Sequence, residues 1–178
     1  MPGETFLRGD RVELRTLEDE DADHLQWARN DPEIRVRSGG PAEPFDEHDT
    51  EEFLEWLRRD DTHALTVCLD GEYIGLVTLK KVRRPADVAD AGVHIVPEEQ
   101  GNGYATEACT LLFDFGFDQL GLHKIGAKAF SFNEPSQGLL ESLGFTLEGT
   151  HREERFANGE YHDVLRYGLL EREWRADG

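Results

Sequence analysis

The chain of 178 residues has a hydrophobic fraction of 38% and an aromatic fraction of 10%, which suits a single compact domain over residues 1–178. Asp and Glu total 38 against 19 Lys and Arg, and the formal net charge of −19 excludes nucleic acid and anionic membranes as expected partners. The sequence has no apolar run of transmembrane length and does not begin with a signal-peptide pattern, so we expect a cytoplasmic protein.

Lysine is scarce in this acidic chain, which contains only Lys80, Lys81, Lys124 and Lys128. Two explanations of the acidity stay open: adaptation to high salt, and an acidic face that attracts a cationic amine or a basic protein. Because the acidic residues are spread along the whole chain, the sequence favours the first explanation.

The cysteines and histidines give no sign of a metal site. Cys68 and Cys109 lie among apolar residues, and we predict that they are reduced thiols of the core. The seven histidines are scattered without the spacing of zinc ligands, so we expect no metal.

The first third of the chain is expected to form one strand and two helices. Val12 and Leu14 alternate with charged residues, which is typical of a half-buried strand. Thr16 and Asp19 indicate a capping box, and Asp31–Pro32 is predicted to break the helix that follows. The predicted elements are a strand over 5–15, a helix over about 19–29, a loop over 30–47 and a helix over about 49–59.

The middle third is expected to hold a hairpin, a third strand and a long helix. Asp70–Gly71 between two apolar runs is a strong hairpin signal. The long helix is apolar on several sides, which predicts burial on more than one side. One stripe contains Tyr104, Ala108, Leu111, Leu112 and Phe115, while Phe113 and Phe117 lie elsewhere. The predicted elements are strands over 64–69, 74–82 and about 88–96, and a helix over roughly 103–120.

The last third is expected to alternate strands with a short helix. Pro135 and Gly144 bound that helix, and Asn158–Gly159 indicates a second hairpin. The predicted strands cover 124–130, about 145–156 and about 161–170. The whole order predicts a layered α/β protein. Its mixed, mostly antiparallel sheet has about seven strands and about four flanking helices, and strands 88–96 and 124–130 are parallel neighbours.

One segment points to chemistry. It runs from Val93 to Ala108 and reads V-H-I-V-P-E-E-Q-G-N-G-Y-A-T-E-A, a strand that enters a glycine turn and opens a helix. The first N–H groups of such a helix lack intrahelical partners and favour an anion, and Gly101 and Gly103 let a ligand approach the backbone closely. The segment therefore predicts a pyrophosphate site, whereas the Walker A and dinucleotide-binding patterns are not matched.

Five segments together resemble the GNAT superfamily of N-acyltransferases, and within it the RimJ/RimL type, which acetylates the N-terminal alanine or serine of ribosomal proteins. The family motif Arg/Gln-x-x-Gly-x-Gly/Ala matches Gln100, Gly103 and Ala105. In chain order the five segments are L-R-G-D-R-V-E-L-R-T-L, P-E-E-Q-G-N-G-Y-A-T-E-A, N-E-P-S, L-G-F-T-L-E-G-T-H-R-E and N-G-E-Y-H-D-V.

The resemblance implies acetyl-CoA as co-substrate and a sheet that splays between its fourth and fifth strands to admit the pantetheine arm. Asn133 would contact the pantetheine or order the helix start, and Ser136 would lie near the thioester sulfur. The implied CoA-binding residues are Val93, Ile95, Val96, Gln100, Gly101, Asn102, Gly103, Tyr104, Ala105, Thr106, Asn133 and Ser136.

Direct attack of an amine on the thioester needs a base, an oxyanion donor and a proton for the leaving thiolate. The oxyanion donor is expected to be the N–H of Ile95 or Val96. Many GNAT enzymes protonate the thiolate with a Tyr on the short helix, but here no Tyr lies between Tyr104 and Tyr161, so Ser136 is the candidate donor. The candidate bases are Glu154, His94 and Glu160, and water is the alternative to all of them.

The preferred function is transfer of an acetyl group to a protein N-terminal amine. Small amines (a polyamine, an aminoglycoside or an amino acid) are the alternative acceptors, and a non-catalytic acyl-CoA sensor is the alternative of another class. Succinyl in place of acetyl, and a monomer or a homodimer, stay open. The loop cations are either solvated or meet the CoA 3′-phosphate or a substrate carboxylate; they are Arg35, Arg37, Arg83 and Arg84.

Overall fold

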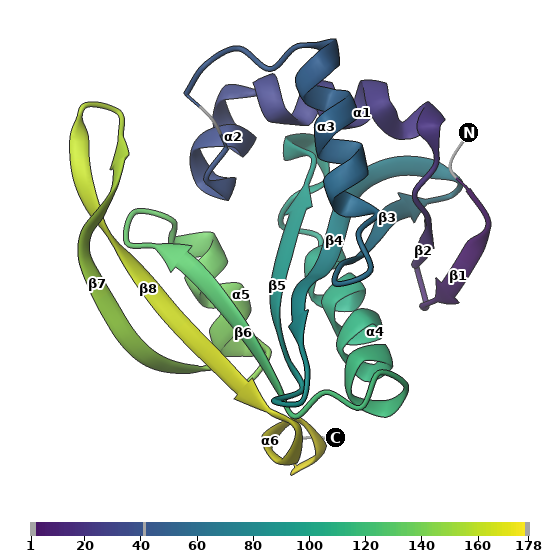
Figure 1. The fold of residues 1–178 in the computed structure, drawn as a ribbon, viewed down its shortest axis with the longest axis vertical. Coiled ribbons are helices and arrows are strands. Elements are labelled where there is room, and N and C mark those ends of the chain that lie inside the picture. Colours follow the sequence, from purple (N-terminus) through teal and green to yellow (C-terminus); the bar gives the residue numbers. More distant parts are fainter. Residues whose placement is uncertain (1–2, 41, 177–178) are drawn as a thin grey trace.

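The computed structural model describes residues 3–40 and 42–176, in which eight strands form one sheet of order β1-β2-β3-β4-β5-β6-β8-β7 (Figure 1). Strand neighbours are antiparallel except β5 and β6, which run parallel. The predicted class, a mixed and mostly antiparallel sheet with helices, is confirmed. The strands are β1 (Thr5–Arg8), β2 (Val12–Thr16), β3 (His63–Leu69), β4 (Glu72–Arg83), β5 (Val88–Ile95), β6 (Lys124–Phe130), β7 (Thr146–Ala157) and β8 (Glu160–Leu170).

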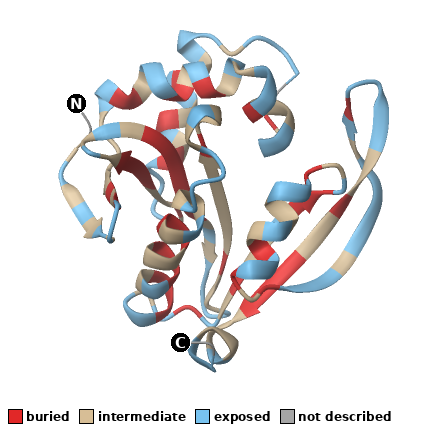
Figure 2. Cartoon of the chain, turned by 180° about the vertical axis from the view of Figure 1, so that it is seen from behind, coloured by how far each residue is buried: buried red, intermediate tan, exposed pale blue. Residues whose placement is uncertain are grey.

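Helices cover both faces of the sheet. Figures 1 and 2 show α4 and α5 on one face, and α1, α2 and α3 over the other face toward one end. The helices are α1 (Ala22–Asn30), α2 (Pro32–Ser38), α3 (Glu47–Leu57), α4 (Tyr104–Asp118), α5 (Glu134–Ser142) and α6 (Glu171–Ala176), with short 3-10 turns at Asp19–Asp21 and Pro97–Glu99. No helix in the described ranges is long and apolar enough to cross a membrane.

The prediction of one strand over 5–15 is wrong. The chain turns between β1 and β2, where the N–H of Gly9 donates to the carbonyl of Val12 over 2.9 Å. The predicted Thr16–Asp19 capping box is also wrong, because Glu18 and Asp21 form the box instead. The extra strand raises the strand number from the expected seven to eight.

The predicted loop over 30–47 contains a helix, α2. The Asp31 carboxylate accepts from the N–H groups of Glu33 and Ile34 over 3.0 and 2.9 Å, and Pro32 stands in the first turn. Gly39, with φ of 76°, ends the helix. Asp31–Pro32 therefore both ends α1 and starts α2, whereas only the end of α1 was predicted. The terminal helix α6 was also not predicted.

Both predicted hairpin turns are confirmed. Asp70 and Gly71 have φ of 50° and 87°, and Asn158 and Gly159 have φ of 52° and 84°. Positive φ at both central residues is the geometry of the two-residue hairpin turns that match the twist of paired strands. The second turn closes the long β7–β8 hairpin, which projects away from the body of the sheet (Figure 1).

Helix α4 supplies much of the core and is buried on more than one side, as predicted, with Ala108 and Leu112 of the predicted stripe fully buried. Phe113 and Phe117 are buried against the sheet, whereas Leu111 and Phe115 are only half-buried at the flanks. Cys109 is also buried on α4, and Cys68 is buried on β3, so both thiols are free and inside the protein. Burial raises the pKa of the Cys109 thiol to about 12.

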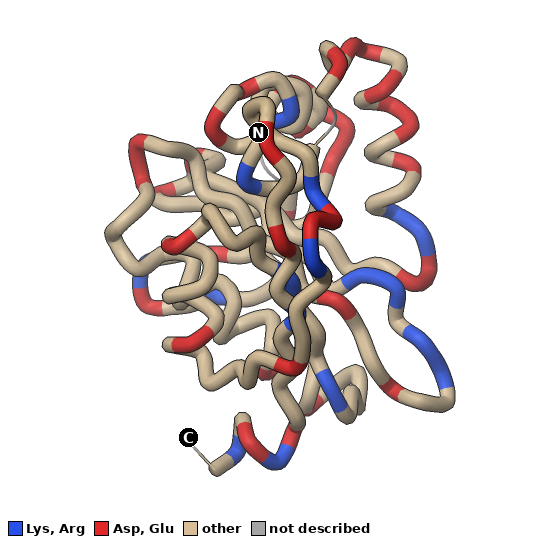
Figure 3. Tube along the Cα trace, turned by 90° about the vertical axis from the view of Figure 1, so that its left-hand side faces the viewer, with Lys and Arg blue, Asp and Glu red and all other residues tan. Residues whose placement is uncertain are grey.

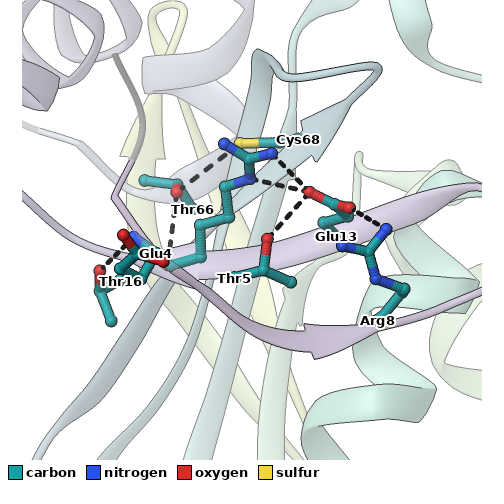
Figure 4. A network of polar contacts seen from close by, with 8 residues as sticks. Glu4, Thr5, Arg8, Glu13, Thr16, Thr66 and Cys68 are labelled. Atoms are coloured by element: carbon teal, nitrogen blue, oxygen red, sulfur yellow. Dashed lines mark hydrogen bonds and ion pairs between the residues drawn. The ribbon is translucent and has the colours of Figure 1, made fainter.

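A polar network joins the strands at the β1 edge of the sheet (Figure 4). The Arg15 guanidinium donates to the Glu13 carboxylate over 2.6 and 2.9 Å, and the same carboxylate pairs with Arg8. Thr5 donates to Glu13 over 3.1 Å. Because Thr5 and Arg8 belong to β1 and the other two residues to β2, these contacts hold the short outer hairpin together.

Glu107 connects the start of α4 to the start of β2. Its carboxylate accepts from the backbone N–H groups of Arg11 and Val12 over 2.7 and 3.0 Å, and from Nε of Arg11 over 3.0 Å. Burial raises the pKa of this carboxyl. The two backbone donors and the Arg11 guanidinium together lower the pKa by more, so the net shift is downward. The beginning of α4 is thereby fixed against the sheet.

We expect Glu107→Gln to lower the free energy of unfolding near neutral pH by about 1–3 kcal/mol, because one of three donors loses its acceptor and the anion is lost. The pKa of Glu107 is lower in the folded protein than the ordinary value of 4.5, so the stability that Glu107 contributes is present above that value and is lost as the pH falls. Urea denaturation of both proteins at a series of pH values measures this. An equal loss in the exposed control Glu55→Gln would contradict a specific role for Glu107.

Candidate active site

Strands β5 and β6 separate after a short paired region. Val88, Ala89 and Asp90 pair with Lys124, Ile125 and Gly126, and the pairing ends there. Beyond this point the two strands diverge into a V-shaped opening (Figure 1). β5 and β6 are the strands expected as the fourth and fifth, so the predicted splay is confirmed.

The edge of β5 that faces this opening carries free backbone groups. Backbone groups of alternate residues in an antiparallel ladder point to opposite sides. Because the N–H of Val96 bonds the carbonyl of Ile74 over 2.9 Å in register with β4, the groups of Ala91, Val93 and Ile95 point away from β4 and into the opening. The N–H of Val96 is therefore already bonded, which corrects its prediction as an oxyanion donor.

The turn after β5 presents a second set of free donors. Gly101 and Gly103 have φ of 79° and 82°, a region that favours glycine. Gly103 caps α4 without a side chain, and no acceptor within the described chain bonds the N–H groups of Tyr104, Ala105 and Thr106. These groups and the dipole of a 15-residue helix make a site for an anion.

Two side chains hold this turn in place. Nε2 of Gln100 donates to the carbonyl of Ile95 over 2.9 Å, so the motif glutamine fastens the turn to the end of β5. Arg11 donates from Nη1 to the carbonyl of Asn102 over 2.8 Å, and its guanidinium lies 4.9 Å from the centre of the Tyr104 ring. Arg11 was missed as a site residue, since its position beside the turn depends on the contact between β2 and α4.

A cleft of about 1050 Å³ occupies the opening and brings most of the predicted residues together. Val96, Asn102 and Glu154 are not among its lining residues, and neither is Glu160. The predicted residues that line it are Val93, His94, Ile95, Gln100, Gly101, Gly103, Tyr104, Ala105, Thr106, Asn133 and Ser136.

Helix α5 brings Asn133 and Ser136 to the β6 side of the cleft. Asn133 is buried and caps α5, because its side-chain oxygen accepts from the N–H of Ser136 over 3.3 Å. Its Nδ2 donates to the carbonyl of Arg37 over 3.4 Å, which connects α5 to α2. Of the two predicted roles of Asn133, ordering the helix start is thus observed. Ser136 is half-buried at the wall of the cleft.

His94 points from β5 to the face that carries α1. Its Nε2 shares a hydrogen bond of 3.0 Å with the hydroxyl of Tyr73, whose ring stacks on that of His24 at 4.5 Å. Burial, and next the nearby Arg29 guanidinium, lower the pKa of His94 to about 4. The imidazole is therefore neutral near pH 7 and a weak base, which does not favour the predicted role as general base.

Glu154 lies on the exposed part of the β7–β8 hairpin. Its carboxylate is 2.5 Å from Nδ1 of His151 and 3.2 Å from Nη2 of Arg166. The hydrogen bond from His151 lowers the pKa of Glu154, with a smaller contribution from Arg166. A paired carboxylate outside the cleft lining is poorly placed for the predicted base.

Cations gather at the cleft although the chain is strongly acidic. All four lysines line it, together with Arg29, Arg37, Arg83 and Arg166, whereas the lining acids are Asp90, Glu99 and Glu148. Elsewhere, acidic residues recur along the trace (Figure 3). Of the loop arginines considered from sequence, Arg35 and Arg84 do not line the cleft. No local signal in the sequence indicated this gathering, because the four lysines come together only through the order of the strands.

No group of His, Cys, Asp and Glu side chains within the described ranges is arranged to hold a metal ion. The binding groups of the cleft are backbone donors, cations and aromatic side chains. This arrangement suits a ligand with an anionic end and an extended arm that can pair with a strand edge.

Comparison with known proteins identifies the family. Residues 11–146 match the acetyltransferase (GNAT) domain, and the chain belongs to the GNAT family of acetyltransferases. The spermidine N(1)-acetyltransferase of Escherichia coli strain K12 is 31% identical over 167 residues, which cover 93% of this chain and 89% of that protein. A candidate ribosomal N-acetyltransferase of Bacillus subtilis, YdaF, is 34% identical over 108 residues, which cover 61% of this chain and 59% of YdaF.

Comparison of the fold with solved structures supports the same family. The crystal structure of spermidine N-acetyltransferase from Vibrio cholerae in complex with CoA and spermine has a TM-score of 0.86 at 29% identity, over 94% of this chain and 99% of that chain. The finer resemblance to the RimJ/RimL type stays a prediction.

The low pKa of His94 gives a testable pH dependence. The unfolded chain binds a proton near the ordinary histidine pKa of 6.5, while the folded protein stays neutral to about 4. We expect the free energy of unfolding of the wild type, measured relative to that of His94→Gln, to fall by about 1–3 kcal/mol as the pH drops from 6.5 to about 4. Urea denaturation measures it, with the exposed His48→Gln as the control. A difference between wild type and His94→Gln that does not change with pH would contradict burial of a neutral imidazole.

Proposed function

We propose that the protein transfers the acetyl group of acetyl-CoA to the primary amine of a small molecule. The single observation that carries this proposal is the continuity between the free edge of β5 and the free helix start of α4, which open into the same cleft. The membership of the GNAT family and the CoA in the similar Vibrio cholerae structure support the same cofactor.

In this proposal, the helix start binds the anionic end of CoA. The pyrophosphate accepts from the N–H groups of Tyr104, Ala105 and Thr106, and Gly101 and Gly103 leave room for it beside the backbone. Arg11 adds a positive charge at the edge of the turn, where its Nη2 would lie 3.3 Å from a β-carbon on Gly103. Fixed amides suit this task in a chain that has few lysines.

The pantetheine arm then lies along β5 toward the closed end of the V. Val93 offers a free N–H and a free carbonyl there, and Ile95 offers its N–H, since its carbonyl accepts from Gln100. The arm takes the place beside β5 where β6 no longer pairs with it. The thioester is carried toward Gly92 and the point where β5 and β6 meet.

The acceptor amine attacks the thioester carbonyl, the carbon–sulfur bond breaks, and CoA leaves as the thiolate. A free N–H of the β5 edge stabilises the oxyanion, and Ser136 is the candidate that supplies a proton to the thiolate. With His94 neutral and Glu154 outside the cleft lining, water in the cleft carries the ammonium proton to bulk solvent and restores the proton that Ser136 gives to the thiolate. Positioning of the two reactants then supplies much of the acceleration.

A small amine is the preferred acceptor because two of the similar proteins are named as spermidine acetyltransferases. A protein N-terminal amine, the acceptor favoured from sequence, is the second candidate, and the similarity to YdaF supports it. The two candidates share the CoA site and differ in the groups that meet the acceptor.

Release of free CoA thiol from acetyl-CoA tests the proposal. We expect release that depends on a small primary amine and is accompanied by a mass increase of one acetyl group on that amine. Release with N-terminal peptides alone would favour the second candidate. Tight acetyl-CoA binding without release for any amine or peptide would contradict the proposal and favour an acyl-CoA sensor.

Gly103→Ala tests the pyrophosphate site. A β-carbon there stands beside the phosphates and raises the strain of a φ of 82°, so we expect acetyl-CoA affinity to fall about tenfold or more. Gly121→Ala is the matched control, since Gly121 also has a positive φ of 67° with open space around it and does not line the cleft. Titration calorimetry measures both affinities. Equal affinity in the two variants would contradict the assignment of the phosphates to this turn.

A further inference from the structure

Two lysines flank the closed end of the V on the face that carries α1 and α3. Lys80 reaches across β5 from β4, and its Nζ would lie 3.4 Å from a β-carbon on Gly92. Lys128 lies on β6 two residues beyond Gly126, which is the last β6 residue paired with β5. The two ammonium groups therefore stand on either side of the point toward which the proposed function carries the thioester.

Neither of these two cations forms an ion pair within the described residues, although Asp90 lies opposite Lys80 in the β4–β5 ladder. No carboxylate of the described residues lies within ion-pair distance of Lys80 or Lys128, whereas Nζ of Lys124 is 2.6 Å from Glu148 and Arg83 is 3.6 Å from Asp90. Among the acids that line the cleft, Asp90 and Glu148 are thus already paired with other cations.

Aromatic rings lie near these two lysines and near the neighbouring Arg29. The ammonium of Lys80 is 6.0 Å from the Trp56 ring, and that of Lys128 is 5.8 Å from the Phe130 ring. The Arg29 guanidinium lies 4.1 Å from the centre of the Phe53 ring, on the same side of the sheet. Burial first, and then repulsion from Lys128, lowers the pKa of Lys80, while the nearby Asp90 carboxylate opposes the shift.

The phosphates of CoA do not account for this pair of lysines. The pyrophosphate site lies beyond the end of β5, and the strand from Gly92 to Val96 spans about 13 Å at the rise of a β-strand. In addition, the Lys80 ammonium lies near Trp56 of α3, whereas α4 covers the opposite face of the sheet (Figures 1 and 2). The two lysines are therefore available to a second anion.

We propose that the acceptor carries an anionic group, a carboxylate or a phosphate, on the same small molecule as its reactive amine. Lys80 and Lys128 bind this group, and the rings of Trp56 and Phe130 bound the space around it. This inference rests on the proposed function and specifies its substrate class. A polyamine, the substrate named for the similar spermidine acetyltransferases, would instead bring a further positive charge against these two ammonium groups, so we expect this chain to differ from those relatives in its acceptor.

Amines with a shared skeleton test the inference. The probes are 5-aminopentanoate, pentylamine and cadaverine, with O-phosphoethanolamine and ethanolamine as a second pair that separates phosphate from carboxylate. We expect kcat/KM for CoA release to be about ten- to hundredfold higher for the anionic member of at least one pair. That preference should weaken as salt is raised, because screening reduces the attraction.

Substitutions of the lysines connect the preference to the site. Lys80→Gln and Lys128→Gln should each lower kcat/KM for the preferred anionic amine about tenfold or more while changing that for the neutral amine little. Lys128 is exposed, so its variant is expected to fold even if Lys80→Gln does not. Lys128→Arg should retain the preference. Arg59→Gln removes a cation whose side chain is 61% exposed outside the cleft lining and serves as the control.

The outcomes separate the two proposals. Equal rates within the pairs, a preference for cadaverine, or an anion preference that survives both lysine substitutions would overturn the anionic acceptor and leave acetyl transfer intact. No release with any of these amines, while calorimetry shows acetyl-CoA binding, would overturn the proposed small-amine transfer and the acceptor class with it.

Discussion

The separation of β5 from β6 after three paired residues is the constraint on which the site depends. A strand inside a sheet normally has its backbone groups bonded on both sides, and unbonded groups that lose water are costly. Here Val93 and Ile95 keep groups that only an inserted ligand or water can satisfy. The same chain segment continues directly into the glycine turn and α4, so the strand edge and the helix start are fixed relative to each other.

The contacts around this segment have a common effect. Gln100 fastens the turn to Ile95, and Glu107 fastens the start of α4 to β2. On the other wall, Asn133 caps α5 and bonds the end of α2. Each contact leaves the N–H groups of the cleft free while it fixes the elements that carry them, which is the preorganisation that binding an extended anionic ligand needs.

Charge is distributed unevenly between the cleft and the rest of the molecule. The chain has a net charge of −19, yet all four lysines line the cleft. The idea that the acidity creates an acidic face for a cationic acceptor is not supported at this cleft, where cations outnumber acids. The acids lie along the remaining trace instead (Figure 3), and adaptation to high salt stays a prediction from the sequence.

Local signals in the sequence predicted most of the fold. Asp70–Gly71 and Asn158–Gly159 gave both hairpins because the turn geometry demands those residue types. The errors fell where one signal served two elements, as at Asp31–Pro32, or where a turn depends on a distant residue, since Glu107 of α4 binds the N–H groups that follow the turn at Gly9. The glycine turn and the splay were also predictable, the latter through the family resemblance.

The acceptor side could not be predicted in the same way. Lys80 and Lys128 are separated by 48 positions in the chain and meet only because β5 lies between β4 and β6. Arg11 likewise reaches the turn at Asn102 through the contact of β2 with α4. Such residues have no local pattern, and the roles assigned to Ser136 and to the proton acceptor stay predictions.

Amide hydrogen exchange with and without acetyl-CoA tests most directly whether the free edge of β5 is the ligand-binding edge. NMR can follow the amides of Val93, His94 and Ile95 one by one. Acetyl-CoA should slow exchange at Val93 and Ile95, whose N–H groups point into the cleft. Exchange at His94 should change little, because the ladder register directs its N–H toward β4. Unchanged exchange at Val93 and Ile95 in the presence of bound acetyl-CoA would contradict binding at this edge.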